Sequence, residues 1–112
     1  MSDWQTLSTV EGLALLGGTG TFRTRETAVS GLLYEIRYPA GVGSPEHTHD
    51  HDSVIYLLSG ELRGTIDGRE VRLAAGETVV HPRGVPHTVE AVEDSHWLEF
   101  KSPLPGRSPL ST

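Results

Sequence analysis

Apolar and polar residues alternate with a period of two along much of this chain. In residues 28–38 the two sets separate cleanly, with Leu32, Tyr34, Ile36 and Tyr38 on one parity and Glu35 and Arg37 on the other. Successive side chains of a strand point to opposite faces, so this pattern predicts a half-buried β-strand. Pro39-Ala40-Gly41 should end it, because proline has no N–H to donate to a neighbouring strand.

Short segments of similar character, separated by glycine and proline turns, fill the rest of the chain. The pattern predicts strands at 13–16, 21–25 (an edge strand), 54–58, 61–66, 70–73, 78–81, 87–92 and 95–101, and an arm or short edge strand within 1–10. Asp67-Gly68 between two of them is a strong hairpin signal. No window has a helical period. We therefore expect an all-β sandwich or barrel: a single domain over 1–112, with the barrel at about 11–101 and a proline-rich tail at 102–112.

Composition narrows the classes of function. The chain has 112 residues, no cysteine and a formal net charge of -6. It offers no thiolate ligand or disulfide, no basic face for nucleic acid, and no apolar run long enough for a membrane span. The first residues lack the basic and apolar regions of a secretion signal, so we expect a cytoplasmic protein with no nucleic-acid or membrane partner.

Histidines concentrate in one stretch, GVGSPEHTHDHDSVIYLLSG at 41–60, where His47, His49 and His51 occupy alternate positions. On a straight strand alternate side chains lie about 6.6 Å apart, so two imidazoles can share a metal ion, whereas His47 and His51 would be ~13 Å apart. This spacing favours His47 and His49 as a pair, with His51 beyond a bend. A second stretch, GETVVHPRGVPH at 76–87, offers His87.

Together the two stretches resemble the paired motifs of the cupin superfamily. Gly41, His47-Thr48-His49, Ser53 and Gly60 match the first motif in spacing, and Gly76, Pro82-Arg83-Gly84 and His87 match the second. The resemblance implies a double-stranded β-helix, a small jelly-roll barrel, with one divalent metal ion (Zn, Mn, Fe or Ni) in its mouth. It assigns His47, His49 and His87 as the ligands.

Two positions depart from the family pattern. Ser53 stands where the family usually has glutamate, and Ala91 where it often has asparagine. Serine is a poor ligand for a divalent ion, so three neutral imidazoles would leave the full +2 charge of the ion in place. Asp50 and Asp52 are possible replacements for the missing carboxylate, although strand alternation turns both away from the ligands.

Further residues are candidates for proton transfer and for substrate binding. Glu99 is a candidate general base if the face that it shares with Trp97 and Lys101 points inward, and His51 is either a proton-transfer group or a solvent-facing loop residue. His81 and His96 look structural or exposed. For substrate binding the candidates are Tyr34, Arg37, Tyr38, Arg83 and Trp97, with aromatic packing or surface exposure as the alternative for each.

The resemblance extends to function. Small cupins that open the ring of unsaturated uronates, and small cupin cyclases of polyketide pathways, carry a similar histidine run. They imply Lewis-acid isomerisation, ring opening, cyclisation or dehydration of a small oxygenated substrate, such as a keto or hydroxy sugar acid or a polyketide-like molecule. A three-histidine iron dioxygenase and a ligand-binding cupin without catalysis are the alternatives. The resemblance also implies a homodimer.

Overall fold

The structure is a computed structural model that describes residues 3–112, and these form strands, turns and loops without a helix. The strands are β1 (Gln5–Leu7), β2 (Thr9–Val10), β3 (Leu13–Ala14), β4 (Gly20–Ala28), β5 (Gly31–Tyr38), β6 (Gly43–His47), β7 (Asp52–Ser59), β8 (Glu61–Ile66), β9 (Arg69–Ala74), β10 (Thr78–His81), β11 (His87–Ala91), β12 (Ser95–Ser102) and β13 (Leu110–Ser111). The described residues therefore offer no helix that could cross a membrane.

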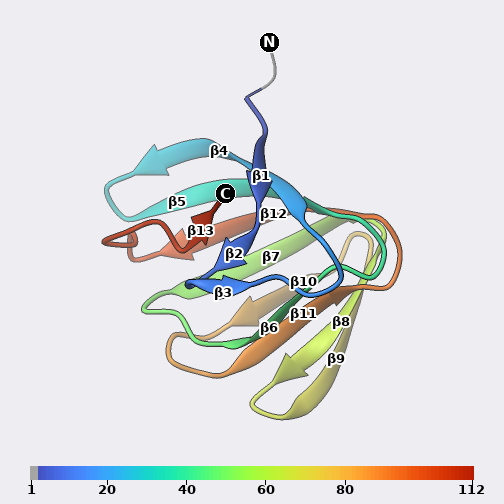
Figure 1. Cartoon of the computed structure of the whole chain (residues 1–112). Coiled ribbons are helices and arrows are strands. Elements are labelled where there is room, and N and C mark those ends of the chain that lie inside the picture. The colour runs from blue at the N-terminus through green and yellow to red at the C-terminus, as the bar shows by residue number, and fades with distance from the viewer. Residues whose placement is uncertain (1–2) are drawn as a thin grey trace.

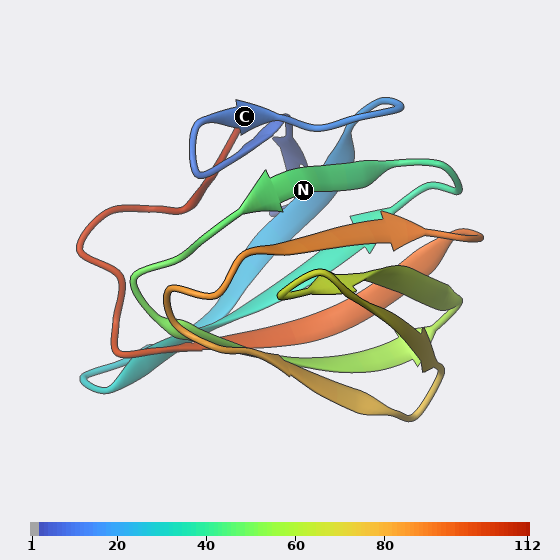
Figure 2. The same cartoon turned by 90° about the horizontal axis from the view of Figure 1, so that it is seen from below.

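Two antiparallel sheets face each other and enclose the core (Figure 1). One sheet has the order β1-β4-β5-β12-β7-β10, and the other has the order β6-β11-β8-β9. A small third sheet, β13-β2-β3, lies beside β6, to which the chain after β3 is bridged at Leu16↔Gly43 (Figure 2). This confirms the all-β jelly-roll barrel that the motifs implied.

The interior is formed by alternate residues of each long strand. In β5 the predicted parity is the buried one, with Tyr34, Ile36 and Tyr38 at 2–3% exposure. In β12 the inward residues are Trp97, Glu99 and Lys101, while Phe100 between them is exposed. The face of β12 that carries Glu99 and Lys101 therefore points into the barrel.

Most strand predictions are confirmed, and two need correction. The segments 61–66 and 78–81 are strands β8 and β10 with the predicted bounds, and Asp67 and Gly68 both have positive φ, as a type I′ hairpin turn requires. The segment 21–25 is not an edge strand, because β1 pairs with it at Gln5↔Phe22. The strand foreseen from residue 28 begins at Gly31, because residues 29–30 form a turn.

The terminal segments pack on the barrel. Of the predicted N-terminal arm, residues 3–10 are described: Leu7 is fully buried, and Trp4 lies on the outer face against the guanidinium groups of Arg23 and Arg37. The proline-rich tail crosses the barrel end and finishes as β13, which pairs with β2 at Leu110↔Val10 (Figure 2). The tail is therefore part of the folded domain.

Candidate metal centre

Three histidines from two segments meet inside the barrel. His47 ends β6, His87 begins β11, and the two residues are direct partners in the β6–β11 pairing. His49 follows in the bend between β6 and β7, so the regular strand spacing does not hold it away from His47. One ring nitrogen from each of the three lies within 4.8 Å of the others. These are the three residues that the motif resemblance assigned as ligands.

Each of the three rings is oriented by an oxygen that accepts from its Nδ1. The acceptors are the Pro45 carbonyl at 2.6 Å from His47, the Val85 carbonyl at 3.2 Å from His87, and the Glu11 carboxylate at 2.8 Å from His49. Carbonyl and carboxylate oxygens only accept, so Nδ1 carries the proton and Nε2 keeps its lone pair. The Nε2 atoms of His47 and His49 are 3.2 Å apart. This is the arrangement that metal-ligating histidines adopt.

Burial keeps these imidazoles neutral. All three side chains are buried, and burial lowers the pKa of His49 to about 2 and that of His87 to about 3; burial also lowers the pKa of His47. The nearby Lys101 ammonium contributes to the lowering at His49. Three buried neutral imidazoles with converging lone pairs fit a divalent ion.

Glu11 is a site residue that the sequence did not reveal. It lies in the turn between β2 and β3, with a φ of 51°, and its carboxylate reaches His49 across 38 positions of the chain. Its side chain is 19% exposed, against 3% for that of His49. Carboxylates in this position raise the basicity of the ligating ring and fix its orientation. No motif marks this residue, because only the fold brings the turn to the barrel mouth.

A small cavity of about 20 Å³ lies beside the three ligands. That volume accommodates a single water molecule or ion. The cavity is lined by Val10, Ile36, Tyr38, Ser44, His47, His49, His81, His87, Val89, Trp97, Glu99 and Leu110. Three sequence candidates, Tyr38, Trp97 and Glu99, therefore share a cavity with the ligands.

Glu99 is held by a donor on each oxygen. Trp97 Nε1 donates to Oε1 at 2.9 Å, and the Lys101 ammonium forms an ion pair with Oε2. Burial alone would raise the pKa of Glu99, but the ammonium and the indole N–H outweigh it and lower this pKa. Lys101 is fully buried and also donates to Ser53 Oγ at 2.8 Å. A buried lysine thus contacts the residue that replaces the family's glutamate.

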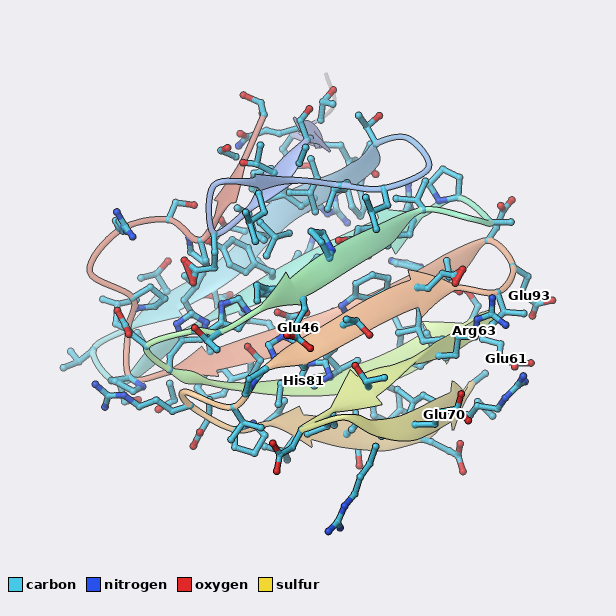
Figure 3. The ribbon with its side chains drawn as sticks, turned by 60° about the horizontal axis from the view of Figure 1, so that its bottom comes forward. Glu46, Glu61, Arg63, Glu70, His81 and Glu93 are labelled. Carbon is cyan, nitrogen blue, oxygen red and sulfur yellow. The ribbon has the colours of Figure 1, made fainter. Side chains whose placement is uncertain are left out.

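Two further histidines flank the ligands. His51 is 2% exposed and stacks on His49 with ring centroids 4.5 Å apart, so it is not a solvent-facing loop residue. Its Nε2 is buried without a hydrogen-bond partner among the described residues. His81, labelled in Figure 3, comes from β10 and stacks on His87 at 4.0 Å. Burial lowers the pKa of each to about 4.

The remaining sequence candidates lie outside this cavity. Arg37 is on the outer face of the sheet against Trp4, and Arg83 is exposed in the loop before β11. Asp52 accepts from the Arg83 backbone N–H at 2.8 Å, so its carboxylate points away from the ligands. Tyr34 is buried, with its hydroxyl 3.4 Å from Ser108 Oγ in the tail.

A second hollow lies at the outer side of His51. It has a volume of about 300 Å³ and is lined by Glu11, Asp50, His51, Pro105, Gly106, Arg107 and Pro109. Since Glu11 and His51 both contact His49, this hollow adjoins the candidate metal centre on its solvent side. The tail forms one wall of the hollow.

Known proteins share both sequence and fold with this chain. The dimethylsulfoniopropionate lyase DddQ of Ruegeria pomeroyi is 31% identical over 80 residues, which is 70% of this chain and 38% of that protein. The tetracenomycin polyketide synthase protein TcmJ of Streptomyces glaucescens is 38% identical over 64 residues, 56% of this chain and 43% of that protein. The chain thus spans less than half the length of either relative.

A solved structure, KdgF from Halomonas sp., has a TM-score of 0.71 at 23% identity, covering 75% of this chain and 78% of that one. That likeness supports the barrel fold. The family model for the cupin domain matches residues 34–100, which include His47, His49 and His87. The chain belongs to the cupin domain family.

Proposed function

We propose that this protein is a metal-dependent enzyme that acts on a small oxygenated molecule by isomerisation, ring opening, cyclisation or dehydration. One observation carries the proposal: three buried histidines present free Nε2 atoms to one point while each Nδ1 is held by an oxygen acceptor. The family includes a lyase, DddQ, and a polyketide synthase protein, TcmJ, which fits chemistry of this kind.

His47, His49 and His87 would hold the ion, and Zn, Mn, Fe and Ni all accept imidazole ligands. When bound, such an ion supplies Lewis acidity to a carbonyl or enol oxygen. The three ligands are neutral, so the cavity favours a substrate that gains negative charge as it reacts.

Two residues are placed to move a proton. His51 has a buried Nε2 with no partner among residues 3–112, so this nitrogen is open to a substrate and accepts a proton in the tautomer that carries its hydrogen on Nδ1. Glu99 lines the ligand cavity, but both of its oxygens already accept hydrogen bonds, which weakens it as a base. We therefore assign the proton-accepting role to His51 and a charge-stabilising role to Glu99.

The substrate would enter from the hollow beside His51. The cavity of about 20 Å³ at the ligands is too small for an organic molecule, whereas the outer hollow of about 300 Å³ has the size of a small ligand site. Arg107 in the tail and Glu11 flank this entrance. Residues 103–109 would therefore shift to let the substrate reach the ligands.

A homodimer, which the family resemblance led us to expect, is also part of the proposal. Val80, Val54 and Phe100 lie side by side on β10, β7 and β12, and all three are 38–48% exposed on the outer face. Tyr56 and Leu58 extend this apolar stripe along β7. A second copy of the chain is the occupant we propose for it. The cytoplasmic location likewise stays a prediction.

The proposed activity is tested with protein reconstituted separately with Zn, Mn, Fe and Ni. Each form is incubated with dimethylsulfoniopropionate, an unsaturated uronate and a linear polyketide analogue, and the products are followed by NMR. We expect turnover of an oxygenated substrate that needs the metal and falls at least about 100-fold in His51→Ala, the range that general-base catalysis contributes. Oxygen uptake with the iron form would indicate a dioxygenase instead, and metal-independent binding without turnover would indicate a binding module.

A further inference from the structure

A lysine is fully buried in the barrel beside the metal centre. Lys101 has 0% exposure and lies on the inward face of β12, two residues after Glu99. Lysines are almost never fully buried without a partner, and exchanging a buried ion pair for apolar residues is often neutral or stabilising. Stability alone therefore gives little reason for this residue.

The ammonium lies in a cross-strand row that leads to the ligands. Lys101 on β12 is the direct partner of Ser53 on β7, and Ser53 is the direct partner of His81 on β10. The His81 ring stacks on the ligand His87 at 4.0 Å. The other contact of the lysine, Glu99, lines the ligand cavity itself. Lys101 is thus connected to the cavity directly through Glu99, and through Ser53 and then His81 on its other side.

The hydrogen-bonding capacity of the ammonium is not exhausted. A lysine ammonium carries three N–H donors. Among the described residues it has two acceptors, Glu99 Oε2 and Ser53 Oγ. One donor of a buried cation is left for a further acceptor. A substrate oxygen that reached the ammonium would complete the set.

The local charge favours an anionic acceptor. The three ligands are neutral imidazoles, so none of the +2 charge of a bound ion is cancelled by them, and Ser53 adds no negative charge. Glu99 offsets the charge of Lys101, and the Glu11 carboxylate beside His49 offsets only part of the charge of the ion. The cavity would carry an excess of positive charge that a carboxylate or enolate can neutralise.

We propose that Lys101 and Ser53 form an anion-binding position beside the metal centre, so that the substrate carries a carboxylate or an enolate oxygen. This inference rests on the proposed function, since it presupposes a metal ion at the three histidines. Lys101 and Ser53 donate to the anionic oxygen and so determine specificity. Glu99 holds the ammonium in place and competes with the anion for it.

The test uses the Co²⁺-loaded protein and follows its visible absorption while acetate is added, with acetamide as the neutral probe of the same shape. Lys101→Met should weaken acetate binding about tenfold to a hundredfold, the usual effect of a hydrogen bond to a charged group. Glu99→Gln should strengthen it, because the competing carboxylate is gone. Acetamide binding should change little in either variant.

Arg72→Met is the matched control, since it removes a cation that pairs with Glu61 on the exposed β8–β9 hairpin. Thermal unfolding checks that each variant is folded. A general loss of structure would weaken acetate binding in both variants, whereas we expect Lys101→Met to weaken it and Glu99→Gln to strengthen it. Co²⁺ binding with unchanged acetate affinity in Lys101→Met overturns this inference alone. Failure of the wild-type protein to bind Co²⁺ overturns the proposed function and this inference together.

Discussion

Glu11 offers a sharp test of the metal centre, because it acts on the metal only through His49. Its carboxylate accepts from His49 Nδ1 at 2.8 Å, and the pair is largely shielded from water. Removing such an outer carboxylate typically weakens metal affinity 10- to 100-fold, which corresponds to about 1.4–2.7 kcal/mol. Glu11→Gln keeps an oxygen acceptor but loses the charge, so we expect about tenfold. Glu11→Ala loses both and should approach 100-fold.

The assay is a competition titration of Zn²⁺ between the protein and a chromophoric chelator. Glu46→Gln is the matched control: Glu46 precedes the ligand His47 on β6, is exposed, and is labelled in Figure 3. Glu46→Gln removes the same charge beside the site without contacting a ligand side chain, so the zinc affinity of this variant should match that of the wild type. Equal zinc affinity of Glu11→Ala and wild-type protein would refute the reasoning.

Three further predictions concern stability and assembly. Leu57→Ala should lower the free energy of unfolding in denaturant by about 2–5 kcal/mol, because Leu57 is fully buried. Leu58→Ala, at the adjacent position with 41% exposure, should lower it by less than about 0.5 kcal/mol. Equal losses would contradict the observation that Leu57 points inward and Leu58 outward on β7. Val54→Asp should convert a dimer to a monomer in light scattering, and an unchanged mass would exclude the apolar stripe as the interface. The metal-free protein should lose stability as the pH falls from 6.5 towards 4, with more than one proton taken up on unfolding, and a flat profile would contradict this. In that window the unfolded chain protonates the histidines that the fold keeps neutral, namely His49, His51, His81 and His87.

The sequence predicted those strands whose local residue pattern allows only one interpretation. Period-two alternation located β5. Asp67-Gly68 located the β8–β9 hairpin, because an Asp-Gly pair between two alternating segments favours a type I′ turn, in which both residues have positive φ. The grouping of His47, His49 and His87 also followed from the sequence, through the resemblance of both motifs to the cupin superfamily. Local signals of this kind need no knowledge of distant contacts.

Features that depend on distant contacts were not predictable. Both faces of β12 carry large apolar side chains, so hydrophobicity does not decide between Trp97 and Phe100 as the inward residue. On the inward face Lys101 donates to Ser53 of β7, a neighbour that only the assembled sheet provides. Glu11 reached the site in the same way, through a turn that the β2–β3 pairing positions at the barrel mouth.

The central claim, a metal ion held by His47, His49 and His87, is tested most directly by elemental analysis of protein purified without added metal, beside His49→Ala. We predict close to one equivalent of Zn, Mn, Fe or Ni per chain in the wild type and a loss of that metal in the variant. Wild-type protein that stays metal-free when each of the four ions is offered would contradict the claim.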